Sequence, residues 1–367
     1  MRERKKMKIF AVSDVHGFCT ELLAALDAAG FDRDNEEHLL VMCGDYFDRG
    51  SEPEAMLDFL EGLDRTRTVL LRGNHDDMME RALSEGKTGR IHEINGTEKT
   101  LSELFGLSPF YLSSALRESR FSPMGKRLHR LLGRMRDMFE TERYCFVHGW
   151  LPSDGIGRFA RLNAEPQYAT AQEWRDARWA EWMEQYRNGK LLDGRQIVCG
   201  HRASAYASSF DPSRARDDSG IFYGDGVIAI DALTVVSGRV NVLVVEDEVM
   251  QSAVHEMSLM DEMLDEMRIG EKTVEMRLFD EKRQNIRCGD TIVFQDTKGR
   301  TLRTEVCGTY RYRSFARLAA DFDPIMLGFD RTYSADGIAA FMKNIYGERE
   351  RENGVLAIRV SLCRDSV

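Results

Sequence analysis

Long apolar segments are missing from this chain of 367 residues. The longest apolar runs, such as the one that ends at Val245, fall well short of the roughly 18 residues needed to cross a bilayer. The basic N-terminus leads into only a short apolar run before Asp14, so it does not read as a signal peptide. Internal repeats and low-complexity tracts are missing too. We therefore expect a cytoplasmic protein with no membrane partner.

Cysteine pairs are also missing. The seven cysteines are an odd number and contain no C-x-x-C motif, which indicates reduced thiols rather than a disulfide framework. With 43% hydrophobic and 31% charged residues, the composition excludes disorder, collagen and coiled coils. The length is about right for two domains.

Charge is unevenly spread along the chain. Residues 262–367 hold 18 basic and 18 acidic residues, so the net charge of −10 lies entirely in residues 1–261. An acidic front part argues against tight, non-specific nucleic-acid binding there. The neutral rear part leaves room for a local basic face.

Three short apolar segments, at residues 8–12, 38–43 and 68–71, each precede a polar stretch that contains glycine. Residues 21–29 and 53–60 lie between them and have apolar residues at helical spacing. Strands and helices that alternate about every 30 residues indicate stacked βαβ units. Ligands bind beyond the carboxyl ends of the strands in such sheets, so the polar stretches are candidate site segments.

Two charged segments interrupt this alternation, and we expect them to be helical insertions near residues 76–140 and 155–192. Further apolar strands are predicted at 144–147, 197–199, 227–230 and 240–245. The first domain is then expected over residues 1–247 and a linker helix over 248–264. From 265 to 367, alternating apolar and polar residues predict a small, β-rich second domain.

The predicted strands of the first domain end in potential metal ligands. The five segments are Asp14-Val15-His16-Gly17, Gly44-Asp45-Tyr46-Phe47-Asp48-Arg49-Gly50, Arg72-Gly73-Asn74-His75-Asp76, His148-Gly149 and Gly200-His201. Carboxylate, imidazole and amide groups bind divalent metals such as Mn, Fe or Zn. Two metals about 3.5–4 Å apart would bind a phosphate and activate a water. A single Asp-x-His motif is weak evidence for a metal site. Core packing alone, however, rarely produces all five segments, each after its own buried strand.

These segments resemble the calcineurin-like metallophosphoesterase family, and within it the serine/threonine-phosphatase-like branch. The forms Gly-Asp-Tyr-Phe-Asp-Arg-Gly and Leu-Arg-Gly-Asn-His-Asp carry the resemblance, which spans about residues 8–247. It implies an α/β fold in which a metallophosphoesterase β-sandwich is flanked by helices. It also implies two divalent metal ions, manganese first, with iron or zinc as alternatives.

The resemblance assigns roles to individual residues. The implied metal ligands are Asp14 and His16 for the first ion, Asn74, His148 and His201 for the second, and Asp45 bridging both. His75 would be the general acid that protonates the leaving group, oriented by Asp48. Arg49 would bind the phosphate oxygens, a task suited to a planar guanidinium.

Departures from the family pattern point to further substrate-binding residues. Many members have Gly-His-x-His where this chain has Gly200-His201-Arg202-Ala203, so the second histidine is absent and water is expected in its place. Trp150 replaces the second glycine of the usual His-Gly-Gly and would place a base-stacking ring near the site. A second phosphate-binding arginine is expected between His148 and His201, and the candidates are Arg178 and Arg202. For Arg178 a solvated helix face is the alternative.

The rear part resembles the ASCH domain, a PUA-like β-barrel of the α+β class, over roughly residues 265–362. The residues 270–277, 288–290 and 354–358 carry the resemblance, which implies binding of RNA or modified nucleosides. Glu275 and Arg277 share one face of the predicted strand, and Lys272 lies just before them. The alternative is a solvated strand face that holds a salt bridge.

The resemblance implies a bimetallic phosphoesterase, a hydrolase in which a metal-bound hydroxide attacks a phosphate ester. The substrate stays open between a phosphoprotein or small phosphomonoester and a nucleotide or RNA brought in by the ASCH-like domain. Another alternative is a non-catalytic RNA-binding protein, although the complete ligand set speaks against it. The rear domain could also be a hydrolase in its own right, through Lys272 and Glu275. The sequence gives no oligomeric state.

Overall fold

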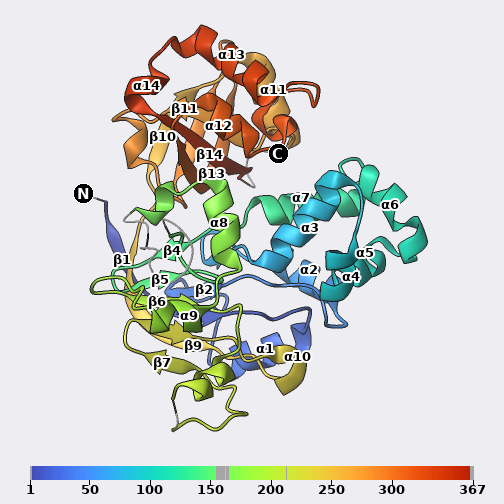
Figure 1. The fold of residues 1–367 in the computed structure, drawn as a ribbon, viewed down its shortest axis with the longest axis vertical. Coiled ribbons are helices and arrows are strands. Elements are labelled where there is room, and N and C mark those ends of the chain that lie inside the picture. The colour runs from blue at the N-terminus through green and yellow to red at the C-terminus, as the bar shows by residue number, and fades with distance from the viewer. Residues whose placement is uncertain (1, 154–161, 163–164, 212, 364–367) are drawn as a thin grey trace. The chain divides into compact units, whose positions relative to one another are not determined.

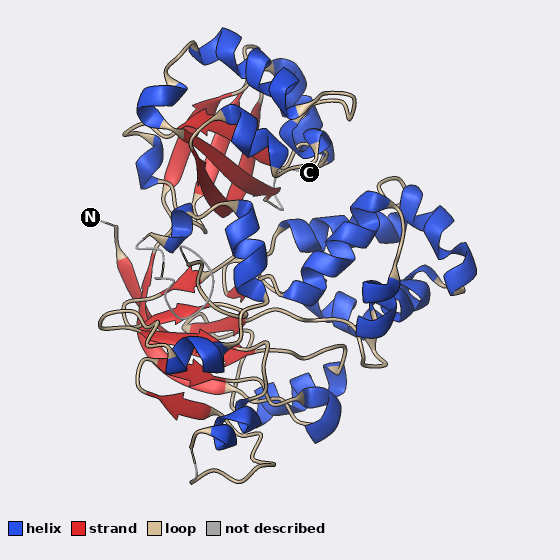
Figure 2. Cartoon of the chain, in the orientation of Figure 1, coloured by secondary structure: helices blue, strands red, loops and turns tan. Residues whose placement is uncertain are grey.

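The computed structural model of the chain describes residues 2–153, 162, 165–211 and 213–363. It divides into two compact units (Figure 1). The N-terminal unit comprises Glu3–Leu162 and Arg175–Met250, and the C-terminal unit comprises Met1–Arg2, Asn163–Trp174 and Gln251–Val367. Both units combine sheets with helices (Figure 2). Among the described residues, no helix is both long and apolar enough to cross a membrane.

Two sheets share one core in the N-terminal unit. The first has the strand order β3-β2-β1-β9 and the second the order β4-β5-β6-β8-β7. The strands are β1 (Arg4–Val12), β2 (His38–Met42), β3 (Thr68–Leu70), β4 (Phe139–Glu140), β5 (Tyr144–Phe146), β6 (Gln196–Cys199), β7 (Phe222–Gly224), β8 (Val227–Ala229) and β9 (Leu243–Met250). Ile9 and Val41 of the first sheet pack with Phe146 and Val198 of the second in one buried cluster. The predicted β-sandwich is confirmed.

Helices pack on the other face of the first sheet, either directly or through one another. They are α1 (Cys19–Ala28), α2 (Pro53–Gly62), α3 (Asn74–Glu85), α4 (Arg90–Asn95), α5 (Thr97–Phe105), α6 (Pro109–Arg117) and α7 (Pro123–Gly133). Because side chains alternate across a strand, Phe10 points away from the sandwich and joins Leu22, Leu57 and Leu131 of the helices in a second buried cluster. The predicted insertion over 76–140 is thus a helical cluster, α3 to α7, that ends at β4 (Figure 1).

The second predicted insertion, 155–192, is described only in part, because residues 154–161 and 163–164 lie outside the described residues. The described part contains α8 (Ala171–Arg178) and α9 (Trp182–Arg187). The short helix α10 (Thr234–Ser237) precedes β9.

The sheet topology brings the carboxyl ends of several strands to one edge. β1, β2 and β3 are parallel to one another, as are β5, β6 and β8. Backbone hydrogen bonds join the loops that follow: the Asp14 N–H donates to the carbonyl of Gly44 at 3.2 Å, and the Gly200 N–H to that of His148 at 2.7 Å. Segments far apart in sequence therefore meet beyond this edge.

One half-buried histidine is expected to make the stability of the helical cluster depend on pH. Burial and the charge of Arg120 lower the pKa of His129 to about 4, while Glu80 partly opposes this. The unfolded chain, with a pKa near 6.5, then takes up the proton first as pH falls. We expect stability to be lost from about pH 6.5 down to about pH 4, by up to about 3 kcal/mol. Urea unfolding at pH 7 and pH 5 measures this loss. A His129→Gln variant that loses as much stability as the wild type would contradict it.

The C-terminal unit is built on one five-stranded sheet with the order β10-β12-β13-β14-β11. Its elements are β10 (Val254–Ser258), α11 (Asp261–Ile269), β11 (Val274–Leu278), β12 (Thr291–Gln295), β13 (Thr301–Tyr312), α12 (Phe315–Ala320), α13 (Ala335–Tyr346), α14 (Glu350–Asn353) and β14 (Val355–Leu362). The long strand β13 shifts register against β14 between Val306 and Gly308. Such a bulge bends the strand, in keeping with a curled sheet.

The linker helix predicted over 248–264 is wrong. Residues 254–258 form β10, which runs parallel to β12, and the helix α11 begins only at Asp261. Val254, Glu256 and Ser258 are exposed whereas Met257 is buried, which is the period of a strand. The acidic, Met-rich composition favours a helix locally, but pairing with β12 overrides that preference.

Candidate metal centre

The backbone is strained where the strand ends meet. Six of the seven non-glycine residues with positive φ in the described chain lie in the predicted site segments: Asp14, His16, Asp45, Asp48, Arg49 and His201. Each such residue costs about 1–3 kcal/mol and persists only where its surroundings over-determine it. Their clustering marks this edge of the sandwich as the candidate functional site.

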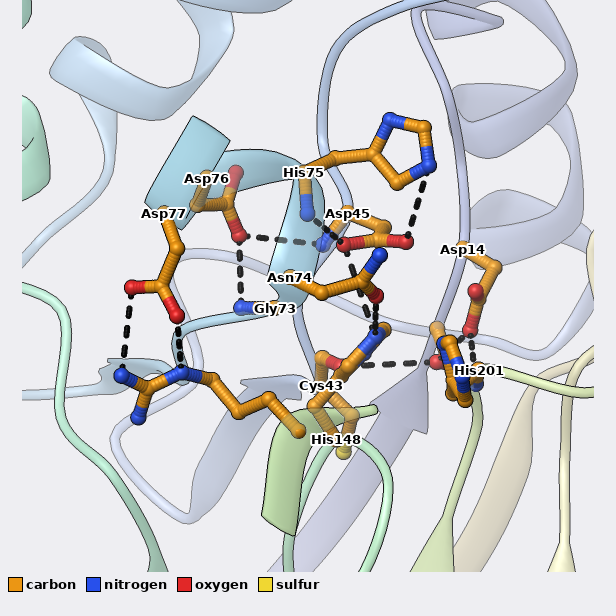
Figure 3. Close-up of polar contacts among 12 residues, drawn as sticks. Asp14, Cys43, Asp45, Gly73, Asn74, His75, Asp76, Asp77, His148 and His201 are labelled. Carbon is orange, nitrogen blue, oxygen red and sulfur yellow. Dashed lines mark hydrogen bonds and ion pairs between the residues drawn. The ribbon is translucent and has the colours of Figure 1, made fainter. Parts of the chain in front are cut away.

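Asp45 lies at the middle of the cluster (Figure 3). Its backbone N–H donates to Asp76 Oδ2 at 3.1 Å, and its Oδ1 accepts from the backbone N–H of His75 at 3.0 Å. His148 Nε2 lies 3.4 Å from Asp45 Oδ1, and His16 Nε2 lies 3.8 Å from Asp45 Oδ2. The two carboxylate oxygens thus face different histidines.

Two groups of side chains have ligand atoms within 4.8 Å of one another: His16, Asp45 and His75, and Asp45, His148 and His201. Asp45 belongs to both, as a bridging carboxylate would. The other two predicted ligands adjoin these groups. Asn74 Oδ1 lies 2.8 Å from His148 Nε2, and Asp14 Oδ2 accepts from the His201 backbone N–H at 2.9 Å. The structure brings all six predicted ligands together.

Hydrogen bonding and burial favour the neutral form of the site imidazoles. The Nδ1 of His16 lies 2.9 Å from the carbonyl of Phe47, and that of His148 lies 2.7 Å from the carbonyl of Cys43. Donation from Nδ1 leaves the Nε2 lone pair available for a metal. Burial holds the pKa of His16 well below its usual range and lowers that of His148 to about 3 and that of His201 to about 2. Metal ligands must be deprotonated, so these lowered pKa values suit the histidines to that role.

The carboxylates of the site crowd one another in a buried space. Burial raises the pKa of Asp14 to about 6 and that of Asp76 to about 7. The pKa of Asp45 is raised well above its usual range by burial and by the charges of Asp14 and Asp76. The Arg49 guanidinium offsets only part of this negative charge. Divalent cations would neutralise it, so oxygen and nitrogen donors of this kind fit such ions.

Glycines allow the backbone to close around these ligands. A Cβ on Gly200 would lie 1.7 Å from Ser13 Oγ and 2.2 Å from Asp14 Oδ2, and one on Gly73 would lie 2.1 Å from Asp45 Oδ1. Gly200→Ala is therefore expected to displace Asp14, to lower metal content and to destabilise the protein by about 1–3 kcal/mol. Metal analysis and thermal unfolding measure both effects. In Gly62→Ala, the matched control, a Cβ meets nothing within 4 Å, and equal losses in the two variants would refute this account.

His75, Asp48 and Arg49 form one hydrogen-bonded set beside Asp45. His75 Nδ1 lies 2.7 Å from Asp48 Oδ2, which also accepts from Thr97 Oγ1 at 2.6 Å. Arg49 Nη2 lies 3.1 Å from His75 Nε2, and Arg49 Nη1 lies 3.3 Å from His16 Nε2. Asp48 thereby fixes the imidazole so that Nε2 faces the centre. The Arg49 guanidinium lies across two site histidines, with the residue exposed to solvent.

Two predicted substrate-binding residues are contradicted. Trp150 is 1% exposed. Because its large ring is buried in the protein interior, it offers no surface on which a base could stack. Arg178 is buried, with Nε 2.6 Å and Nη2 3.1 Å from Asp77 and with Nη1 2.9 Å from Asp137. Arg178 is therefore neither on a solvated helix face nor available to bind a phosphate. Its buried charge needs the two carboxylates as partners.

Arg202, the other arginine candidate, is accessible. Its side chain is 44% exposed and forms an ion pair with Glu181 at 2.5 Å. It follows His201 directly in the chain, so it lies next to the metal centre.

Sequence reasoning gave Asp76, which lies in a predicted site segment, no role in the centre, and it missed Asp231 and Thr97 altogether. Asp76 Oδ2 accepts from the backbone N–H groups of both Gly73 and Asp45, which holds two site loops together. Asp231 follows β8, and burial together with the charge of Asp14 raises its pKa well above the usual range; the strand-end pattern alone could have found it. Thr97, in contrast, lies 49 residues from Asp48 at the start of α5, and no motif marks it.

The predicted residues of the rear domain also lie together. Glu275 Oε2 is 3.1 Å from Lys272 Nζ, and Glu275 Oε1 is 3.1 Å from Arg277 Nη2. Lys272 and Glu275 are buried, so the solvated strand face is wrong. Lys272 Nζ further donates to the carbonyls of Val274 and Leu327. The carboxylate lies between two cations in a largely buried cluster.

Comparison with known proteins places both parts of the chain. Residues 7–233 match the calcineurin-like phosphoesterase family, and residues 257–362 match the ASCH domain. The symmetrical bis(5′-nucleosyl)-tetraphosphatase of Aliivibrio salmonicida (strain LFI1238) is 34% identical over 96 residues, which are 26% of this chain. The chain spans about a third (32%) of the length of that curated relative.

Two solved structures are similar to parts of the chain. A protein from Pyrococcus furiosus, solved by NMR, is 26% identical and covers 30% of this chain and 98% of its own, with a TM-score of 0.26. A putative diadenosine tetraphosphatase is 14% identical and covers 67% of this chain and 95% of its own, with a TM-score of 0.37. The family match alone covers more than half of the sequence. The chain therefore belongs to the calcineurin-like phosphoesterase family, whose members are hydrolases that act on phosphate esters, and it carries a C-terminal ASCH domain.

Proposed function

We propose that this chain is a metal-dependent phosphoesterase whose centre is organised by Asp45. The observation that carries the proposal is the position of Asp45 in two ligand groups at once. The proposed ligands are Asp14, His16 and Asp45 for one ion and Asp45, Asn74, His148 and His201 for the other. Two divalent ions, manganese first and iron or zinc as alternatives, would polarise a water and neutralise charge on the phosphate.

The chain's own side chains supply the remaining chemistry. Arg49, with its guanidinium beside His16 and His75, is proposed to bind the phosphate oxygens, where planar donors match the charge that develops in the transition state. His75 is proposed to donate a proton from Nε2 to the leaving oxygen. Asp48 holds Nδ1 of that ring, so it acts as a positioning residue that keeps Nε2 aimed at the site.

The substrate is open between a phosphoprotein or small phosphomonoester and a nucleotide or RNA. The nucleotide candidate is favoured by the similarity to a protein named bis(5′-nucleosyl)-tetraphosphatase. The ASCH domain adds the proposal of an RNA or nucleoside contact at the cluster of Lys272, Glu275 and Arg277, in which Arg277 is the most exposed side chain.

A panel of substrates tests the activity and separates these candidates. The full-length protein is assayed with p-nitrophenyl phosphate, a phosphopeptide, a dinucleoside polyphosphate and a 2′,3′-cyclic nucleotide, with a chelator and with added Mn²⁺. We expect metal-dependent turnover of at least one of them. Turnover of none at any metal concentration would count against a phosphoesterase and in favour of a non-catalytic RNA-binding protein.

A further inference from the structure

Trp179 differs from the other tryptophans in keeping a large exposed surface. It is 45% exposed, whereas Trp150, Trp174 and Trp182 are 1%, 2% and 0% exposed. Its ring meets the ring of His201 edge to face, with centroids 5.9 Å apart and planes at 82°. An indole left half in water forgoes much of the stabilisation that burial gives. The exposed ring lies beside a residue of the metal centre.

The segment that carries Trp179 is firmly held. Arg178, directly before it, is fixed by ion pairs to Asp77 and Asp137. The backbone N–H of Trp150 donates to the carbonyl of Ala177 at 2.9 Å. A ring on such a fixed segment loses little conformational freedom when a ligand packs on it.

A cavity adjoins this segment, because Glu181, two residues after Trp179, and Arg202, directly after His201, both line it. Its volume is about 660 Å³, and its polar lining includes Glu181, Glu184, Arg187, Asn188 and Arg202. Trp182 Nε1 donates to the carbonyl of Arg202 at 2.8 Å, which fixes the backbone there. The volume falls within the range of small-molecule sites and is far larger than a phosphate group needs.

The lining of the cavity selects the chemistry of its ligand. Arg187, Arg202 and Asn188 offer hydrogen-bond donors, and Glu181 and Glu184 offer acceptors. The ion pair of Arg202 with Glu181 is exposed on both sides, so it contributes little and can open for a ligand. A nucleotide has a flat aromatic base together with donors, acceptors and negative charge. A phosphotyrosine ring has no donor or acceptor edge to match the lining.

We propose that Trp179 and this cavity form the subsite for the part of the substrate beyond the scissile phosphate, and that this part is a nucleotide. The base stacks on Trp179, and Arg202 binds the polar groups that follow. The inference rests on the proposed phosphoesterase function, because it places this subsite next to that reaction centre.

Two substrates that share a terminal phosphate test the subsite. ADP releases its β-phosphate with AMP as the leaving group, and glycerol 2-phosphate releases phosphate without a base. In Trp179→Ala, the ratio of kcat/KM for ADP to kcat/KM for glycerol 2-phosphate should fall about ten- to hundredfold, as expected for the loss of one stacked base. Trp179→Phe should restore most of the ratio. Tyr223→Ala removes another exposed aromatic residue and should keep the wild-type ratio.

A binding measurement makes the result independent of turnover. AMP should quench the tryptophan fluorescence of the metal-loaded wild type and quench Trp179→Phe much less. Metal content and thermal unfolding of each variant show whether it is intact. An unchanged ratio of kcat/KM in an intact Trp179→Ala variant would overturn the subsite. A fall in kcat/KM for O-phosphotyrosine as large as the fall for ADP in that variant would overturn it too. Absence of metal-dependent turnover in the wild type, with AMP quenching retained, would instead overturn the phosphoesterase function.

Discussion

Replacement of Asp45 by asparagine should remove both metal binding and hydrolysis. Asp45 is the residue shared by the two ligand groups, so losing its charge weakens both ion sites together. Metal analysis should find less than half of the wild-type content, and turnover should fall to background. Without metal, the variant should be more stable than the wild type by about 0.5–2 kcal/mol, because it removes a carboxylate crowded by Asp14 and Asp76.

Asp217→Asn is the control for this change, since Asp217 is exposed and has no part in the centre. It should keep metal content and turnover. The wild type should also gain stability when Mn²⁺ is added, as any ligand of the folded state confers, and Asp45→Asn should not. An Asp45→Asn protein that still melts at a higher temperature with Mn²⁺ would show that Asp45 does not organise the site.

Replacement of His75 by alanine should separate catalysis from metal binding. If His75 acts as the general acid, turnover should fall by about 10²–10⁴-fold while the protein keeps its metals. The measurement is metal content beside steady-state kinetics of the same preparation. Asp48→Asn should shift the pH profile of turnover, because Asp48 acts through the orientation of the His75 ring.

The geometry gives this experiment a definite alternative. His75 also belongs to one of the two ligand groups, with His16 and Asp45, so it has the position of a ligand as well as that of an acid. If His75→Ala loses about half of its metal, His75 is a ligand and the assignment as an acid fails. Full turnover in His75→Ala would show that His75 is neither the general acid nor a required metal ligand.

The strand-end residues could be predicted because their signal is local. Asp14, Asp45 and His148 each follow a short apolar run, and parallel strands bring their carboxyl ends to one edge whatever the loops do. The order of motifs was therefore enough to predict that these candidate metal ligands lie together. Thr97 could not be predicted in this way, because its contact with Asp48 depends on how the helical insertion packs.

Predictions failed where burial decides the role of a residue. Trp150 and Trp179 look alike in the sequence, yet the first is buried and the second half exposed. Arg178 looks like a surface arginine until Asp77 and Asp137 are placed around it. The expected linker helix failed for a related reason, because the pairing of β10 with β12 is a long-range interaction that local helix preference does not contain.

The most direct test of the central claim is the metal content of protein purified without chelator, measured together with turnover of p-nitrophenyl phosphate with and without Mn²⁺. A bimetallic centre organised by Asp45 predicts close to two divalent ions per chain and turnover that depends on Mn²⁺. Protein that binds no metal and shows no turnover at any metal concentration would contradict this prediction and would favour a non-catalytic RNA-binding protein.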